Sequence, residues 1–129
     1  MTATRPADRP LRGVLIADAV VGLVTAIGML AATAMYTNLT GLPESLLRTA
    51  AVLLFGYVAA LTVAAVLRPV RRALVVGIIV ANGAWVVASA LVALLVPMAV
   101  AGLVYVLGQA LVVIGFGVAE YLALRRVRD

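Results

Sequence analysis

The longest uncharged run in the chain restricts its fold more than any other feature. No charged residue occurs between Arg72 and Glu120, so positions 73 to 119, 47 in all, carry none. A single helix of that length would measure roughly 70 Å, whereas the hydrocarbon core of a bilayer is about 30 Å thick. The run must therefore fold back on itself. Because proline starts a helix well but cannot continue one, Pro97 predicts a tight turn between two membrane-spanning helices.

The composition of the whole chain also indicates an integral membrane protein. Its 129 residues are 66% hydrophobic, more than a soluble domain of this size can bury. The chain has no histidine and no cysteine, which excludes imidazole and thiolate metal sites, disulfides and histidine bases. With no base near Ser45 or Ser89 and no phosphate-binding glycine loop, we expect no enzyme, no cofactor and no metal.

Four apolar segments are long enough to span a membrane. They cover about 11–36, 46–67, 73–95 and 98–124, with a polar connection at 37–45 and a basic turn at 68–72. The first segment, with Ala32-Thr33-Ala34 at its end, imitates a signal peptide, but it is too long for one and contains Asp18. We therefore predict an all-α polytopic membrane protein. We expect residues 1–129 to form a single membrane domain, an antiparallel four-transmembrane-helix bundle whose first ten residues are a disordered tail.

The positive charge of the chain is distributed very unevenly between the two ends of these segments. The net charge is +5, and Arg48 is the single arginine on one side. The other side carries Arg5, Arg9, Arg12, Arg68, Arg71, Arg72, Arg125, Arg126 and Arg128. By the positive-inside rule, this side and both termini are expected in the cytoplasm. The charge thus follows membrane topology, and we expect the lipid bilayer and no nucleic acid as a partner.

The few polar residues inside the spans fall into stripes at 100° per residue. The first stripe holds Asp18 with Gly22, Thr25, Met29 and Tyr36, and the second span instead has small residues at Gly56, Ala60 and Ala64. Because a polar group facing lipid has no partner, the stripes are expected to point at one another. We call the candidate site residues the polar seam: Asp18, Asn82, Trp85, Ser89, Tyr105, Gln109 and Glu120.

Each part of the polar seam has a structural and a functional interpretation. Asn82 and Gln109 could form interhelical hydrogen bonds, worth about 0.6–2 kcal/mol each, or a ligand or ion site near the midplane. Trp85 lies deeper than an interfacial anchor and fits the core or the wall of a pocket. Asp18 and Glu120 could pair with arginines at the cytoplasmic end, or one of them could carry a proton or cation.

Several short patterns resemble a group of small bacterial four-span integral membrane proteins. They are Leu42-Pro43 before Leu47-Arg48, the stretch 82–89, Gln109-Ala110 and Arg125-Arg126. The resemblance implies four spans in a bacterial inner membrane and no particular activity. In size and span number the chain is also similar to small multidrug resistance transporters, which use an acid in the first helix. Asp18 is the candidate for that acid, although that family has Glu there and places it deeper.

These observations predict a non-enzymatic inner-membrane protein whose bundle binds a partner protein, a lipid or another copy of itself. The alternative is a small cation- or proton-coupled transporter that uses Asp18, with Asn82, Trp85, Ser89 and Gln109 lining its pathway.

Overall fold

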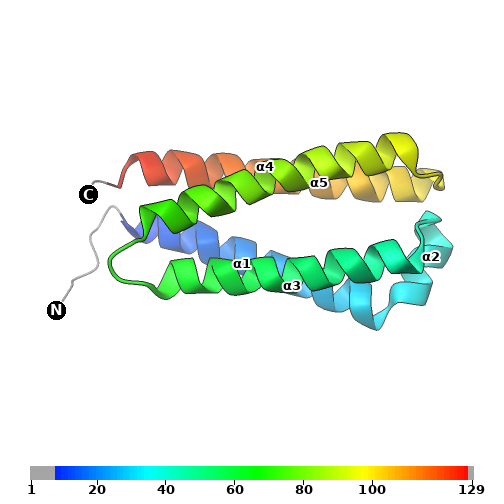
Figure 1. Ribbon diagram of the computed structural model, residues 1–129, viewed down its shortest axis with the longest axis horizontal. Coiled ribbons are helices and arrows are strands. Elements are labelled where there is room, and N and C mark those ends of the chain that lie inside the picture. The colour runs from blue at the N-terminus through cyan, green and yellow to red at the C-terminus, as the bar shows by residue number, and fades with distance from the viewer. Residues whose placement is uncertain (1–7, 128–129) are drawn as a thin grey trace.

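The computed structural model describes residues 8–127, which fold into helices without any strand in that range (Figure 1). The helices are α1 (Asp8–Ala31), α2 (Thr33–Thr40), α3 (Glu44–Val66), α4 (Arg72–Leu95) and α5 (Val100–Arg125). All but the short α2 are long and apolar enough to cross a membrane. The predicted all-α bundle of four spans is therefore confirmed. Residues 8–10 of the predicted disordered tail are helical, and residues 1–7 lie outside the described range.

The first predicted span, 11–36, is wrong in one respect, because it is divided into α1 and α2 at Ala32. Ala32 has φ −122° and ψ 34°, outside the helical region. The backbone hydrogen bonds continue through the bend, since Ala32 N–H donates to the Gly28 carbonyl and Tyr36 N–H to the Ala32 carbonyl, both at 3.0 Å. The Thr33 hydroxyl donates to the Met29 carbonyl at 2.6 Å, a contact that favours bending of a helix.

The predicted polar connection at 37–45 is also shorter than expected, and only residues 41–43 lie outside helices. Gly41 ends α2 in the left-handed conformation with φ 78°, and its N–H donates to the Thr37 carbonyl at 2.9 Å. Such a glycine is the usual stop signal at a helix C-terminus.

The helices pair into two hairpins that lie side by side (Figure 1). α1 packs most extensively on α3, and α4 on α5, while α1 touches α5 and α3 touches α4 over smaller areas. We call the first half hairpin A (α1–α3) and the second hairpin B (α4 and α5). The turn between them lies at the same end of the bundle as the start of α1 and the end of α5, and we call this end the terminal end (Figure 1). The opposite end, with α2, is the far end.

The terminal end is closed by apolar side chains and capped by arginines. A terminal-end core joins both hairpins and consists of Leu11, Leu15, Leu61, Ala64, Ala65, Val75, Ile78, Ala123, Leu124 and Val127. At its edge, Arg12 donates to the Ala65 carbonyl at the end of α3, and Arg72 donates to the Val127 carbonyl at 3.0 Å, just past α5. Arg12 thereby satisfies a carbonyl that the C-terminus of α3 leaves without a partner.

The far end is held together by close backbone contact between the hairpins. Ala99 N–H donates to the Thr40 carbonyl at 2.9 Å, which ties the start of α5 to the end of α2. A Cβ atom at Gly102 would lie only 2.2 Å from the same carbonyl oxygen, so this approach requires glycine. A second buried cluster around Leu42, Leu47 and Ala51 packs next to this contact, on the side of the bundle's interior.

The small-residue stripe expected in α3 does not mediate its packing as a whole. Ala64 is buried, but Gly56 is exposed, and an added Cβ atom there would meet nothing within 4 Å. The close approach comes from α1 instead, where a Cβ atom at Gly22 would lie 2.9 Å from Cγ2 of Val58.

Candidate functional site

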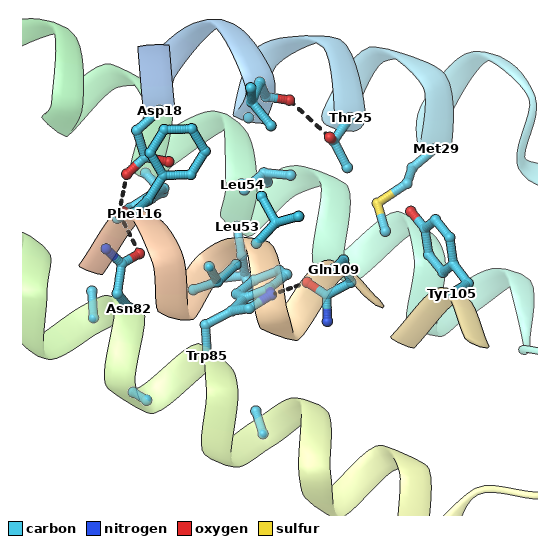
Figure 2. A pocket seen from close by; sticks show the side chains of 18 residues that line it. Asp18, Thr25, Met29, Leu53, Leu54, Asn82, Trp85, Tyr105, Gln109 and Phe116 are labelled. Carbon is cyan, nitrogen blue, oxygen red and sulfur yellow. Dashed lines mark hydrogen bonds between the residues drawn. The ribbon is translucent and has the colours of Figure 1, made fainter. Parts of the chain in front are cut away.

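A cavity of about 440 Å³ lies between the two hairpins (Figure 2). It runs from Asp18 and Asn82 at one end to Met29 and Tyr105 at the other. Asp18 and Met29 are eleven positions apart, which corresponds to about 16 Å along α1. A smaller hollow of about 190 Å³ continues toward the far end and shares Trp85, Tyr105 and Gln109 with it. The lining is mainly apolar, and Asp18 is its one charged residue among those that the structure describes.

The cavity is not sealed from the surrounding bilayer. Leu53 of α3 lines it and is nevertheless 61% exposed, and Val112 of α5 lines it and is 48% exposed. Ala84 and Ala88 of α4 are likewise exposed lining residues. These positions belong to the middle parts of spanning helices, so the openings face lipid rather than water.

Four polar side chains, one from each spanning helix, meet at the Asp18 end of the cavity. We call Asp18, Tyr57, Asn82 and Glu120 the carboxyl cluster. The Tyr57 hydroxyl lies 3.0 Å from Oδ2 of Asp18 and also bonds Oδ1 of Asn82. Asn82 Nδ2 in turn donates to Oε1 of Glu120 at 2.7 Å. A continuous series of side-chain hydrogen bonds therefore links α1, α3, α4 and α5.

Among the described residues the carboxyl cluster forms no ion pair with an arginine, which corrects one interpretation of the two acids. Within residues 8–127 the ion pairs are Arg12 with Asp8 at 4.0 Å and Arg48 with Glu44 at 3.4 Å. The expected pairing of arginines with Asp18 and Glu120 is therefore absent there. The physical reason is the terminal-end core, whose Leu15 precedes Asp18 and whose Ala123 follows Glu120, so that an apolar layer separates acids from arginines.

Hydrogen-bond donors are scarce in the carboxyl cluster. Two carboxyl groups and an amide oxygen accept, whereas one hydroxyl and one amide nitrogen donate. The Tyr57 hydroxyl has a single proton for two neighbouring acceptors. Glu120 is 0% exposed, and its Oε2 has no hydrogen-bond partner in the described part of the chain. An unsatisfied buried acceptor is costly, so this cluster is suited to taking up a proton, another hydrogen-bond donor or a positive charge.

A second polar group, which we call the amide cluster, joins α4 to α5 in the middle of the cavity wall. Trp85 Nε1–H donates to Oε1 of Gln109 at 2.8 Å (Figure 2). Gln109 Nε2 in turn donates to Oγ of Ser89 at 2.8 Å. The Ser89 hydroxyl donates to the Trp85 carbonyl at 2.8 Å. Every side chain of this cluster has a partner within it, so it fixes α4 against α5 and holds the indole ring in place.

The polar seam thus divides into two clusters and Tyr105. Asn82 and Gln109 point inward but do not bond each other, because Asn82 belongs to the carboxyl cluster and Gln109 to the amide cluster. The Tyr105 ring lies 5.6 Å from the Tyr36 ring, and its buried hydroxyl has no hydrogen-bond partner among the described residues. Those residues also contain no group of three or more side chains suited to holding a metal ion.

Tyr57 is the site residue that sequence reasoning missed. The signal was present, because Tyr57 lies in the middle of the second span, whereas membrane tyrosines are usually enriched at the interfaces. It also has the helical spacing of the buried positions Leu61 and Ala64. A tyrosine at that depth on a buried face needs a hydrogen-bond partner.

Comparison of the chain with protein-family models, with curated proteins and with solved structures finds no match. The cavity and its side chains are therefore the basis on which a function can be proposed.

Proposed function

We propose that this chain is a non-enzymatic protein of the bacterial inner membrane that binds a small amphipathic or apolar molecule between its two hairpins. The cavity is the observation that carries the proposal. Its volume of about 440 Å³ falls within the ~300–1,000 Å³ of typical small-molecule sites. Packing defects in a bundle with a purely structural role are few and rarely exceed the size of a water molecule.

The openings of the cavity support a ligand that arrives through the bilayer. Leu53 and Val112 line the cavity and are exposed at membrane depth, so a molecule dissolved in lipid can enter without crossing water. Another copy of the chain is a less suitable occupant, because one of its helices would need a continuous groove along the whole bundle. The contacts at both ends, through the terminal-end core and the Ala99–Thr40 bond, limit the opening to the middle.

Trp85 provides the test, because it is the only tryptophan of the chain and it lines the cavity. We would titrate the purified protein in detergent with 1-bromododecane, whose bromine quenches indole fluorescence on contact. Binding in the cavity predicts saturable quenching. Ala88→Phe should weaken it at least about fivefold, since Ala88 lines the cavity and the larger ring occupies it.

Ala90→Phe is the matched control, because Ala90 is exposed on the same helix and does not line the cavity. This variant should be quenched like the wild type. Quenching that rises linearly without saturation, and equally in both variants, would mean that the probe only partitions into the micelle, and the binding proposal would be wrong.

A second candidate is a cation- or proton-coupled transporter, favoured by an Asp18 that lines the cavity and has no arginine partner within residues 8–127. The test is pH-gradient-driven uptake of sodium, potassium or tetramethylammonium into proteoliposomes. From the binding proposal we expect no uptake by the wild type. A gradient-dependent flux that disappears in Asp18→Asn, with folding intact, would favour the transporter instead.

A further inference from the structure

We propose that the molecule bound between the hairpins is an amphipathic amine, with its ammonium group against Asp18 and its apolar body extending toward Trp85 and Tyr105. This inference rests on the proposed binding function and names the chemical class of the ligand. It follows from three properties of the cavity: its charge, its shortage of hydrogen-bond donors and the shape of its apolar part.

The charge of the cavity is negative at one end and zero elsewhere. Asp18 is the only charged residue among the described lining, and Glu120, which does not line the cavity, is connected to it by hydrogen bonds through Asn82 and Tyr57. Within residues 8–127 neither acid forms an ion pair with an arginine. A charged head group entering this end is therefore expected to be positive, because a phosphate or carboxylate would meet the like charge of Asp18 in a medium of low dielectric constant.

The shortage of donors identifies the kind of positive group. Asp18 lines the cavity, and the single proton of the Tyr57 hydroxyl is shared between Asp18 and Asn82. A primary ammonium group brings three N–H donors together with its charge. An alcohol brings one donor and no charge, and a quaternary ammonium brings charge without donors. Of these head groups, the primary amine fits the carboxyl cluster best.

The remainder of the cavity suits an alkyl chain or a small ring system. From Asp18 to Met29 it extends over about 16 Å, and Leu54, Trp85 and Phe116 line it between these ends (Figure 2). The aromatic rings of Tyr57 and Phe116 line the cavity near the carboxyl cluster, and aromatic rings attract a nearby cation.

The experiment compares three head groups attached to the same dodecyl chain. Dodecylamine, 1-dodecanol and dodecanoate would each compete with 1-bromododecane for the Trp85 quenching of the wild-type protein at pH 7. We expect dodecylamine to displace the probe at a concentration at least about tenfold lower than 1-dodecanol, and dodecanoate to be the weakest. Asp18→Asn should reduce the advantage of the amine to less than about threefold.

Glu44→Gln is the matched control for the loss of one negative charge, because Glu44 lies on the surface at the far end, beside Arg48. It should retain the wild-type preference. Equal potency of amine and alcohol in the wild type would overturn the amine inference while saturable quenching left the binding function intact. A preference retained in folded Asp18→Asn would overturn it too, and if that variant does not fold, the wild-type series alone decides.

Discussion

Tyr57 is the residue through which the carboxyl cluster holds the two hairpins together. Its hydroxyl contacts Asp18 within hairpin A and Asn82 of hairpin B. Within residues 8–127 the other hydrogen bond between the hairpins, from Ala99 to Thr40, lies at the far end. In a low-dielectric interior each member of such a chain depends on the others, because a group that loses its partner keeps the cost of its burial.

Removal of the Tyr57 hydroxyl should therefore destabilise the bundle. Tyr57→Phe keeps the ring but leaves Asp18 and Asn82 without this donor. We expect the free energy of unfolding to fall by about 1–2 kcal/mol, measured by denaturant titration in detergent with circular dichroism. Tyr121→Phe, at a half-exposed position near the terminal end, should change it by less than about 0.5 kcal/mol. An equal effect of the two substitutions would contradict the role of the Tyr57 hydroxyl.

At the scale of the helices, the number and position of the spans were predictable, whereas the bend was not. Uncharged runs and arginines define the four spans, because each charge at the bilayer centre is costly. No proline or glycine marks Ala32 as a break. At the bend, the Thr33 hydroxyl donates to the Met29 carbonyl. The Tyr36 hydroxyl lies against Gly28, which has no side chain to exclude it. Such contacts appear only once the helix has folded.

The candidate site was predictable in part for a related reason. Helical spacing identified the inward faces that carry Asp18, Asn82 and Glu120, since polar groups avoid lipid. Spacing gives no distances between helices, however. It could not show that the apolar layer around Leu15 keeps the acids from the arginines, or that Tyr57 would join Asp18 to Asn82.

The crossing of α2 and α5 makes Gly102 the most restricted position of these helices. In Gly102→Ala the new Cβ atom would meet the Thr40 carbonyl oxygen, which belongs to the backbone and cannot turn away. We expect a loss of about 1–3 kcal/mol in the free energy of unfolding, measured as for Tyr57→Phe. Gly108→Ala on the same helix meets nothing within 4 Å and should be neutral or stabilising. A neutral Gly102→Ala would show that the two helices are farther apart.

At the scale of the whole molecule, the arginines make the two ends of the bundle unlike. In the described part of the chain Arg48 lies toward the far end, and the terminal end carries Arg9, Arg12, Arg68, Arg71, Arg72, Arg125 and Arg126. This asymmetry supports the proposal that the terminal end faces the cytoplasm.

Cysteine labelling tests this orientation cleanly, because the chain has no cysteine of its own. Ser45→Cys places a thiol at an exposed far-end position, and Arg126→Cys places one at an exposed terminal-end position. In intact cells a membrane-impermeant maleimide should label the first variant and leave the second unlabelled until the membrane is permeabilised. The reverse pattern would show the opposite topology.

The terminal-end core is also expected to hinder the passage of ions along the interior of the bundle. Leu11, Leu15 and Val75 are fully buried in it, and the buried guanidinium of Arg12 donates to the Ala65 carbonyl at its edge. A hydrated cation on the terminal side would have to shed its water among apolar side chains and pass this positive charge, and hydrophobic constrictions block conduction in this way. We therefore expect the carboxyl cluster to be shielded from cations on that side.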